Sequence, residues 1–261
     1  MTRLETRTFV VLASLALAPP ALADLAEIKA SGVLRVVAVR EEAPEMFSFS
    51  DTGEPGFERE IIEGFARLQG VKVQPVPAAN ADERITLLNK GAGDVIIGIV
   101  VTEARKKLVD FSSEVLPSRH VVVNYQPQPP IETLEAFRAA KVGVVKGTSW
   151  AQAAVEAGIP AGSLEYFGDR YQAFDALKAG RIGATVITLS DYTLALRRYP
   201  GAQAGLTLGA STVAAMAVRK GDHQLLAALD EYLENFRKGP SWSRLVVKYF
   251  GEKALAVLGR K

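Results

Sequence analysis

Apolar residues along this chain change their spacing from one segment to the next. Short runs rich in Val and Ile alternate with longer stretches in which apolar residues recur every three or four positions, the spacing of an amphipathic helix. The first half of the pattern predicts a strand at 33–39, a helix at 57–69, a strand at 71–76, a short helix ending at Gly91 and a strand at 94–101. The last run is almost wholly apolar, which is typical of a parallel strand covered on both faces.

The predicted helix at 57–69 has two distinct faces. The face expected to pack on the sheet carries Ile61, Phe65 and Leu68. The face expected to lie in water carries Glu58, Arg59 and Glu63. Gly70 follows directly, and glycine is the residue type that most often ends a helix.

A proline-rich break, with prolines at 127, 129 and 130, precedes a second series of the same kind. This series predicts helices at 131–140, 149–157, 174–180 and 189–198, strands at 142–145, 182–187 and 213–218, and two C-terminal helices. Open α/β sheets bind ligands beyond the carboxyl ends of their strands. We therefore expect two lobes with a functional cleft between them.

The N-terminal segment has the features of an export signal. Arg3 and Arg7 precede an apolar run at 9–17, and an Ala-Leu-Ala tripeptide follows at 21–23. The sequence predicts a signal peptide over residues 1–23, cleavage before Asp24 and a periplasmic location. No later stretch approaches the roughly 20 apolar residues that a membrane-spanning helix needs.

The composition argues against several classes of function. The chain has no cysteine, which excludes disulfides, thiolate catalysis and thiolate metal sites. Its 31 basic and 29 acidic residues are interspersed, so the basic stripe of a nucleic-acid-binding protein is missing. His120 and His223 are far apart in the sequence, and we find neither a glycine-rich phosphate loop nor a nucleophile elbow. We expect a monomer without metal, cofactor or nucleic-acid partner.

Blocks of sequence across the chain resemble the family 3 extracellular solute-binding proteins, the polar amino-acid-binding proteins of ABC importers. The most recognisable block is Thr-Glu-Ala-Arg-Lys-Lys at 102–107, with Asp-Phe-Ser at 110–112. Further matching blocks lie at 32–36, 47–53, 56–61, 87–97, 142–149, 176–182, 217–222 and 248–251. No block is decisive alone, and the resemblance rests on their order and spacing.

The resemblance implies an α/β protein with the two-lobe periplasmic-binding-protein-like (type II) fold and a ligand cleft between the lobes. Lobe one would comprise residues 24–117 plus 219–261, and lobe two residues 118–218. In this family, hinge closure captures an amino acid or a related small carboxylate. An inner-membrane ABC permease then receives the ligand, so the resemblance also implies such a permease as partner.

Arg105 is the strongest candidate for binding a carboxylate. It follows the apolar strand at 94–101 and Thr102, which can cap the next helix, so its side chain is expected to face the cleft. A guanidinium matches a carboxylate with two parallel hydrogen bonds. The resemblance assigns this arginine to the ligand's α-carboxylate and places Thr148 and Ser149 on the same group from lobe two. Ordinary helix N-capping is the alternative interpretation of Thr148 and Ser149.

Three further residues are candidates for the walls of the cleft. Phe47 matches an aromatic position in the family's first cleft loop, where a ring can cover the apolar part of a ligand. Its neighbour Phe49 is expected in the core instead. Trp150 is a second possible wall, and Gly98 is expected among the ligand contacts.

Two positions depart from the family pattern. Val100 stands where the family commonly has a hydroxyl residue, and Thr188 stands where it has an aspartate for the α-ammonium group. Burying an ammonium without a partner is costly, so either the ligand is not an ordinary α-amino acid or another carboxylate serves. The candidates are Glu41, Glu42 and Asp191, and a solvated acid pair is the alternative for the first two.

Two other functional classes are compatible with the sequence. The resemblance extends to periplasmic cyclohexadienyl dehydratases, whose chemistry needs a general acid in the cleft, but no pattern singles out one carboxylate for that role. An adaptor or sensor partner that keeps the fold without binding a solute is the third class. We expect solute binding without catalysis.

Overall fold

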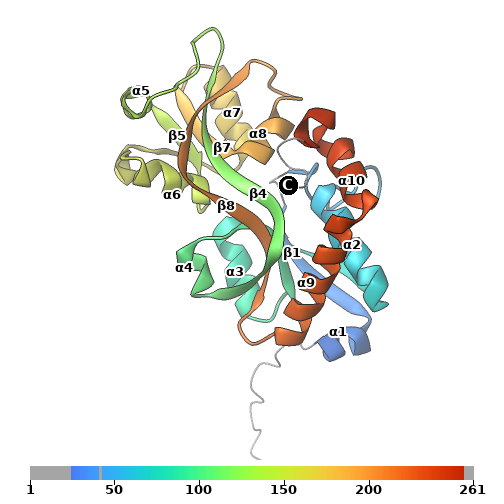
Figure 1. Ribbon diagram of the computed structural model, residues 1–261. Coiled ribbons are helices and arrows are strands. Elements are labelled where there is room, and N and C mark those ends of the chain that lie inside the picture. The colour runs from blue at the N-terminus through green and yellow to red at the C-terminus, as the bar shows by residue number, and fades with distance from the viewer. Residues whose placement is uncertain (1–24, 41–42, 256–261) are drawn as a thin grey trace, which may run out of the picture.

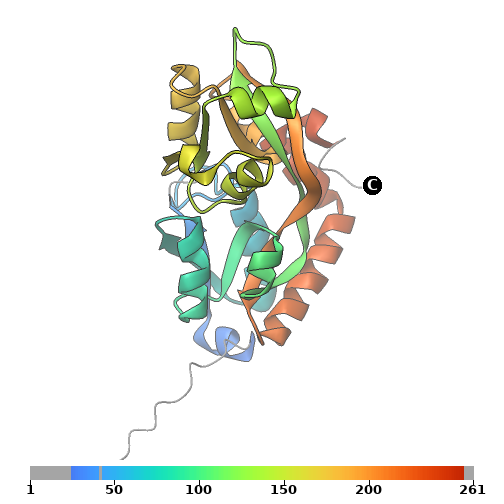
Figure 2. The same cartoon turned by 90° about the vertical axis from the view of Figure 1, so that its left-hand side faces the viewer.

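The computed structural model describes residues 25–40 and 43–255. The expected signal peptide, its cleavage site, Glu41 and Glu42 lie outside the described residues. Figure 1 shows two α/β lobes joined by two long strands, β4 (Val109–Tyr125) and β8 (Ala202–Arg219). Figure 2 shows these strands passing from one lobe to the other along one side of the molecule. The two-lobe α/β fold expected from the sequence is therefore confirmed.

The strands of both lobes belong to one sheet with the order β2-β1-β3-β8-β4-β7-β5-β6. The shorter strands are β1 (Val33–Val39), β2 (Lys72–Ala78), β3 (Val95–Val100), β5 (Val142–Val145), β6 (Glu165–Phe167) and β7 (Ala184–Thr188). Within each lobe these strands run parallel, whereas β8 pairs antiparallel with β3 and β4 pairs antiparallel with β7. The antiparallel pair β4 and β8 is thus the covalent and hydrogen-bonded link between the lobes.

Helices cover each set of strands. Those of the first lobe are α1 (Leu25–Ser31), α2 (Phe57–Gln69), α3 (Ala81–Asn89), α4 (Glu103–Lys106), α9 (His223–Lys238) and α10 (Pro240–Phe250). Those of the second lobe are α5 (Leu134–Ala139), α6 (Ser149–Glu156), α7 (Arg170–Lys178) and α8 (Leu189–Ala195). Two 3-10 turns complete the described elements, η1 (Ala161–Ser163) and η2 (Glu252–Ala254). Each lobe has its own apolar core, one around Phe65 and Trp242 and the other around Phe137 and Phe174.

The local pattern predicted several elements at their observed bounds. The strands at 33–39 and 142–145 and the helix at 57–69 match β1, β5 and α2. Gly70 ends α2 in the left-handed conformation, with φ of 73°. The pattern did not predict α1, β4, β6 or the first half of β8.

The two cores show where each long strand changes lobe. Along β4, Leu116 belongs to the first core and Val121 to the second. Along β8, Leu208 belongs to the second core, and pairing with β3 has begun by Ala214. The expected boundary lies after Val218. The chain returns to the first lobe several residues earlier, because the last residues of β8, from Ala214 onward, already pair with β3 of that lobe.

The expectation that Glu58 and Arg59 face water is wrong. Their exposed fractions are 6% and 9%, whereas Leu68, expected on the buried face, is 72% exposed. The segment before α2 explains the difference, since it folds over the first turn of the helix. Backbone N–H groups of this turn donate to the carbonyls of Glu45 and Met46, at 2.9 and 2.8 Å. The guanidinium of Arg59 donates to the carbonyl of Ser48 at 2.6 Å.

The corrected faces of α2 can be tested by stability measurements. We expect Phe65→Ala to lower the free energy of unfolding by about 3–5 kcal/mol, because it opens a cavity in the first core. Leu68→Ala is the matched control and should change it by about 0.5 kcal/mol or less. Urea denaturation followed by circular dichroism measures both changes. Equal losses for the two variants would contradict the observed orientation of the helix.

Candidate functional site

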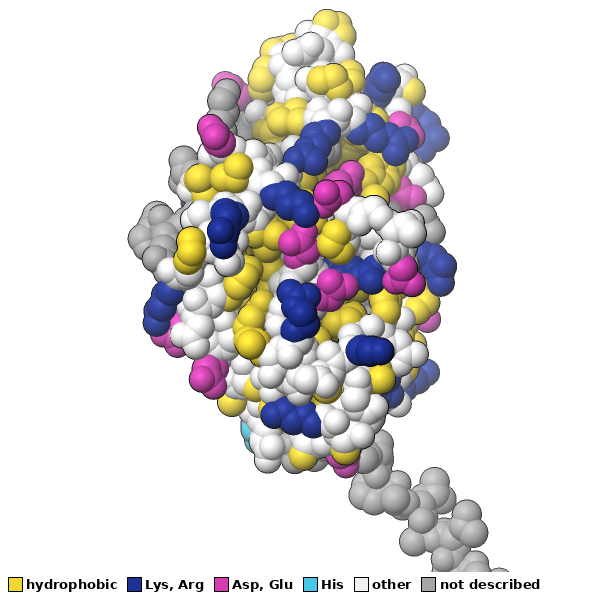
Figure 3. Space-filling view, turned by 90° about the vertical axis from the view of Figure 1, so that its right-hand side faces the viewer, with side chains coloured by type: hydrophobic (Ala, Val, Ile, Leu, Met, Phe, Trp, Pro, Cys, Tyr) yellow, Lys and Arg dark blue, Asp and Glu magenta, His cyan; other side chains and the backbone are white. Residues whose placement is uncertain are grey.

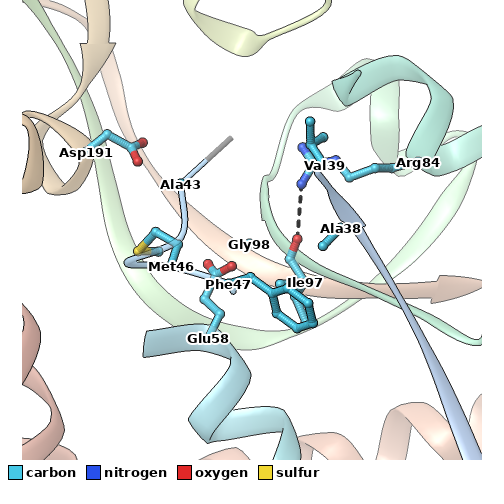
Figure 4. Close-up of a pocket in the computed structure, with 10 residues that line it drawn as sticks. All are labelled: Ala38, Val39, Ala43, Met46, Phe47, Glu58, Arg84, Ile97, Gly98 and Asp191. Carbon is cyan, nitrogen blue, oxygen red and sulfur yellow. Dashed lines mark hydrogen bonds between the residues drawn. The ribbon is translucent and has the colours of Figure 1, made fainter. Parts of the chain in front are cut away.

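The candidate site lies where segments that follow the parallel strands of both lobes meet. Because β1, β3, β5 and β7 all carry their carboxyl ends toward the other lobe, the residues after them line the gap. Figure 4 shows a pocket there, of about 390 Å³ including its open mouth. Its lining residues are Ala38, Val39, Ala43, Met46, Phe47, Glu58, Arg84, Ile97, Gly98 and Asp191.

Two buried charged side chains of lobe one belong to this pocket. Arg84, on α3, donates from Nη1 to the carbonyl oxygen of Ile97 at 3.2 Å, as Figure 4 shows. Glu58, on α2, lies against Gly98, where an added Cβ would be 2.2 Å from both carboxylate oxygens. Gly98 also has φ of 54°, so both its backbone conformation and this close approach require glycine. The pocket thus sets a buried acid and a buried base among apolar walls.

Asp191 contributes a carboxylate from lobe two. It lies in the first turn of α8, whose N-cap is Thr188. The hydroxyl of Thr188 donates to one carboxylate oxygen of Asp191, and Arg170 donates to the other at 2.8 Å. Thr188, which stands at the family's ammonium-binding position, is therefore buried and holds the acid that lines the pocket.

Arg105 reaches from one lobe to the other. Thr102 caps α4 by accepting a hydrogen bond from the Arg105 N–H at 3.2 Å, as expected. The guanidinium donates to the carbonyl of Val100 at 2.8 Å and, across the cleft, to the carbonyl of Gly147 at 3.3 Å. The side chain is half-buried and faces the cleft, at the end of the strand that carries Gly98.

The lobes approach closely at Gly147. This residue has φ of 73°, and an added Cβ would lie 2.6 Å from a carboxylate oxygen of Asp82 on α3. At α10, Arg197 of lobe two donates to the carbonyl of Tyr249 at 2.5 Å. The described structure is therefore a closed arrangement of the two lobes.

Glu45 forms a further bridge across the cleft. Its carboxylate accepts hydrogen bonds from Arg170 and from the hydroxyl of Tyr171, both at 3.1 Å. The side chain of Arg170 is only 2% exposed and also pairs with Asp191. Burial alone would lower the pKa of Arg170, but the charges of Asp191, Tyr171 and Glu45 outweigh it and raise the pKa above its ordinary value. Arg170 therefore stays charged and binds acids of both lobes.

Thr148 and Ser149 lie at the start of α6, where the sequence left two interpretations open. Thr148 is the N-cap: its hydroxyl accepts from the N–H of Ala151 at 3.4 Å and donates to the carbonyl of Val145 at 2.7 Å. Ser149 is buried, and its Oγ lies 2.9 Å from Nε2 of His120. N-capping thus accounts for Thr148, whereas the hydroxyl of Ser149 contacts a histidine of β4.

A second hollow lies beside this contact and is larger than the first, about 1350 Å³ counted in the same way. Its walls include Thr102, His120, Ser149, Glu156 and Thr212. Both Thr102 and Ser149 belong to the segments that flank the Arg105 contact with Gly147. The second hollow therefore adjoins that contact.

The remaining candidate residues are placed as follows. Phe47 lines the first pocket and packs edge-to-face on Phe49, with ring centroids 5.3 Å apart. Val100 is buried and contributes its carbonyl to Arg105. Trp150 packs in the core of lobe two and lines neither hollow, so its role as a wall of the cleft stays a prediction.

Sequence reasoning missed Glu58, Arg84, Glu45 and Arg170 as parts of the site. Glu58 lies off the apolar face of its helix, which is the signal of a solvated residue in any periodicity argument. Glu45 and Arg170 are 125 residues apart, so only the closed fold reveals their contact. The one available signal was the loss of the family aspartate at Thr188, which pointed to another acid, and Asp191 was among those considered.

The surface and the described elements show little that points to another class of site. Figure 3 shows lysine, arginine and acidic side chains interspersed over the face formed by α9 and α10. Within residues 25–40 and 43–255, no three His, Cys, Asp or Glu side chains are grouped so as to hold a metal ion. No helix among the described residues has the length and apolar character that a membrane span requires.

Solved structures with the same fold include amino-acid-binding proteins. A mutant of ArgBP from T. maritima is 28% identical, with a TM-score of 0.78 over 87% of this chain and 99% of that one. The solute receptor for L-cysteine of Neisseria gonorrhoeae is 26% identical, with a TM-score of 0.78 over 90% of this chain and 95% of that one. At these values the likeness covers both lobes.

Relatives among curated proteins are named as lytic transglycosylases rather than as amino-acid-binding proteins. Membrane-bound lytic murein transglycosylase F of Stutzerimonas stutzeri (strain A1501) is 29% identical over 250 residues, which is 93% of this chain and 50% of that protein. The same-named protein of Pseudomonas putida (strain KT2440) is 30% identical over 87% of this chain and 48% of its own length. The chain therefore spans about half the length of the curated relatives it matches.

The family comparison covers both lobes and the cleft. The sequence matches the bacterial extracellular solute-binding proteins, family 3, over residues 34–252, a range that contains Glu45, Glu58, Arg105, Ser149 and Asp191. This range includes every block on which the sequence resemblance rested except the first two residues of the block at 32–36. The chain belongs to the bacterial extracellular solute-binding proteins of family 3.

Proposed function

We propose that this protein is the periplasmic binding component of an ABC importer, and that it works as a monomer which captures an amino acid or a related small carboxylate by closing its lobes. The observation that carries the proposal is the position of Arg105, whose guanidinium bonds to carbonyls of both lobes. A ligand carboxylate can replace the Gly147 carbonyl as acceptor and engage both arms of the guanidinium. Closure then follows because the ligand binds the closed form more tightly than the open one.

The acids of the first pocket support a ligand that also carries a positive charge. Glu58 of lobe one and Asp191 of lobe two line the same pocket, and no aspartate stands at position 188 to serve an ammonium group. A cationic group in this pocket would be stabilised by both carboxylates. An ancestral arginine-binding protein is described as bound to arginine and to glutamine, and another structural relative as a solute receptor for L-cysteine, which favours an α-amino acid.

The proposal is one of binding without catalysis. A dehydratase would need a cleft carboxyl group that gives up a proton to the ligand. Both oxygens of Asp191 already accept hydrogen bonds, from Thr188 and Arg170, so a proton on Asp191 would disrupt the structure that holds it. Transfer of a captured solute to a membrane permease, rather than its conversion, is the role we assign.

A thermal-shift panel of ligands tests the proposal. We expect at least one L-amino acid to raise the unfolding temperature, since a ligand at about 100 times its Kd stabilises a protein by about 2.7 kcal/mol. L-Arginine should be paired with 5-guanidinopentanoate, which lacks only the α-amino group. A larger shift with L-arginine is the result expected if Glu58 and Asp191 bind the ammonium. Failure of every amino acid and carboxylate to shift the transition would contradict the proposed function.

Arg105→Ala should lose most of the affinity for any ligand that the panel identifies. Removing one partner of a buried, hydrogen-bonded charge pair costs about 2–5 kcal/mol. Calorimetric titration measures the loss of affinity. The affinity of Arg105→Lys should lie between those of the unaltered protein and Arg105→Ala, because lysine keeps the charge but lacks the two parallel donors of the guanidinium. Lys107→Ala, on an exposed neighbour, is the control and should bind as the unaltered protein does. Unchanged affinity in Arg105→Ala would rule out the carboxylate site assigned to it.

Gly147→Ala should weaken binding by preventing full closure. The added methyl group would meet the carboxylate of Asp82 on the opposite lobe, and overpacking of this kind costs about 1–3 kcal/mol. Adding Asp82→Ala should restore part of the affinity. Gly180→Ala is the matched control, because Gly180 has a similar φ of 69° with nothing within 4 Å of the added carbon. If both glycine variants lost affinity equally, backbone strain rather than lobe contact would be responsible.

A further inference from the structure

The contact between His120 and Ser149 connects the ligand cleft to a titratable group. His120 lies on β4, one of the two strands shared by the lobes, opposite Thr188 of β7 and Leu208 of β8. Ser149 is the first residue of α6, and its Oγ is 2.9 Å from Nε2 of His120. Both side chains are buried, and both line the second hollow.

The direction of this hydrogen bond decides what Ser149 can offer a ligand. A serine hydroxyl has a single proton. When Nε2 of His120 carries no proton, Ser149 donates to it and has no proton left for a carboxylate. When Nε2 carries a proton, it donates to Ser149, and the hydroxyl proton is then available to an anion in the cleft.

Charged groups around His120 come from several elements. Burial is the main influence and lowers the pKa of His120 below its ordinary value. The charge of Glu156 on α6 acts against this, and that of Arg105 on α4 adds to it. The wall of the same hollow also carries Glu103 and Arg138, whereas β7 and β8 face His120 with the uncharged Thr188 and Leu208. The imidazole is therefore neutral in the empty protein at neutral pH.

We propose that His120 is a positioning residue that acts through Ser149, so that the protein holds a ligand carboxylate more tightly when His120 is protonated. The inference rests on the proposed function, in which the cleft between Arg105 and α6 receives that carboxylate. Protonation adds a positive charge beside the anion. Starting from the neutral tautomer whose proton is on Nδ1, it also turns the Ser149 hydroxyl toward that anion. The two effects have the same sign.

The direction of the pH dependence follows from linkage. A bound anion favours the charged imidazole, so the ligand raises the pKa of His120 above its value in the empty protein. Affinity is then greatest below the pKa of the empty protein and falls as the pH rises through the pKa of the complex. Each unit of this pKa difference corresponds to about a tenfold change in Kd. Acidification therefore favours capture and a neutral medium favours release.

The experiment combines calorimetry with NMR, using L-arginine as the probe. We expect the Kd to be about tenfold lower at pH 5 than at pH 8. The chain has only two histidines, His120 and His223, so the imidazole signals can be assigned and titrated with and without the probe. The pKa of His120 should rise when L-arginine binds, and this rise should be smaller in Ser149→Ala, which keeps only the direct effect of the imidazolium charge on the anion.

Two substitutions of His120 separate positioning from a merely structural role. His120→Gln keeps an amide N–H near the place of Nε2–H, so it should bind well at every pH. His120→Leu removes the donor and should bind weakly at every pH. His223→Gln, at the exposed start of α9, is the control and should keep the pH dependence. Urea denaturation establishes that each variant is folded.

Two results would overturn the inference. If L-arginine binds but leaves the titration of His120 unchanged, His120 is not coupled to the ligand, although the proposed binding function stands. If no member of the ligand panel stabilises the protein, the proposed function fails and the inference fails with it. A pH dependence that persists in His120→Gln would also assign the effect to another group.

Discussion

One side chain, Arg105, connects the two halves of this molecule at the place where a ligand would lie. Its position has a simple origin in the chain. An apolar strand ends at Val100, Thr102 caps the following turn, and the cap fixes the direction of the guanidinium. The bond to Gly147 depends in turn on the absence of a side chain there, since the lobes approach too closely for one. The cleft is thus defined by a cation on one lobe and exposed backbone on the other.

The chemistry of the cleft extends beyond this contact. A small pocket holds buried charges of both signs, Glu58 and Arg84, among apolar walls. A larger hollow adjoins the contact, and His120 and Ser149 meet in its wall. At position 188 this family 3 fold has a threonine, whose hydroxyl donates to Asp191, and Asp191 lines the small pocket together with Glu58.

Local sequence pattern was sufficient for several elements, although not for α1, β4 or β6, and was insufficient for the site. The bounds of β1, β5 and α2 follow from signals carried by neighbouring residues, namely short apolar runs for the two strands and helical spacing that ends at Gly70 for α2. The sequence likewise predicted the capping of α4 by Thr102, since the cap involves neighbours in the chain. It did not predict the burial of Glu58, because a loop preceding its helix covers this side chain. The contact between Glu45 and Arg170 joins segments that no local rule relates.

The placement of Arg170 has a consequence for how the lobes separate. Its guanidinium is buried in lobe two and shares its charge between Asp191 of that lobe and Glu45 of the other. When the lobes part, Glu45 regains water while Arg170 keeps Asp191, so no isolated ion is stranded in the interior. The ion pair between Arg170 and Glu45 can therefore break and form again without a large electrostatic barrier. The proposed capture and release of a ligand would require such reversibility.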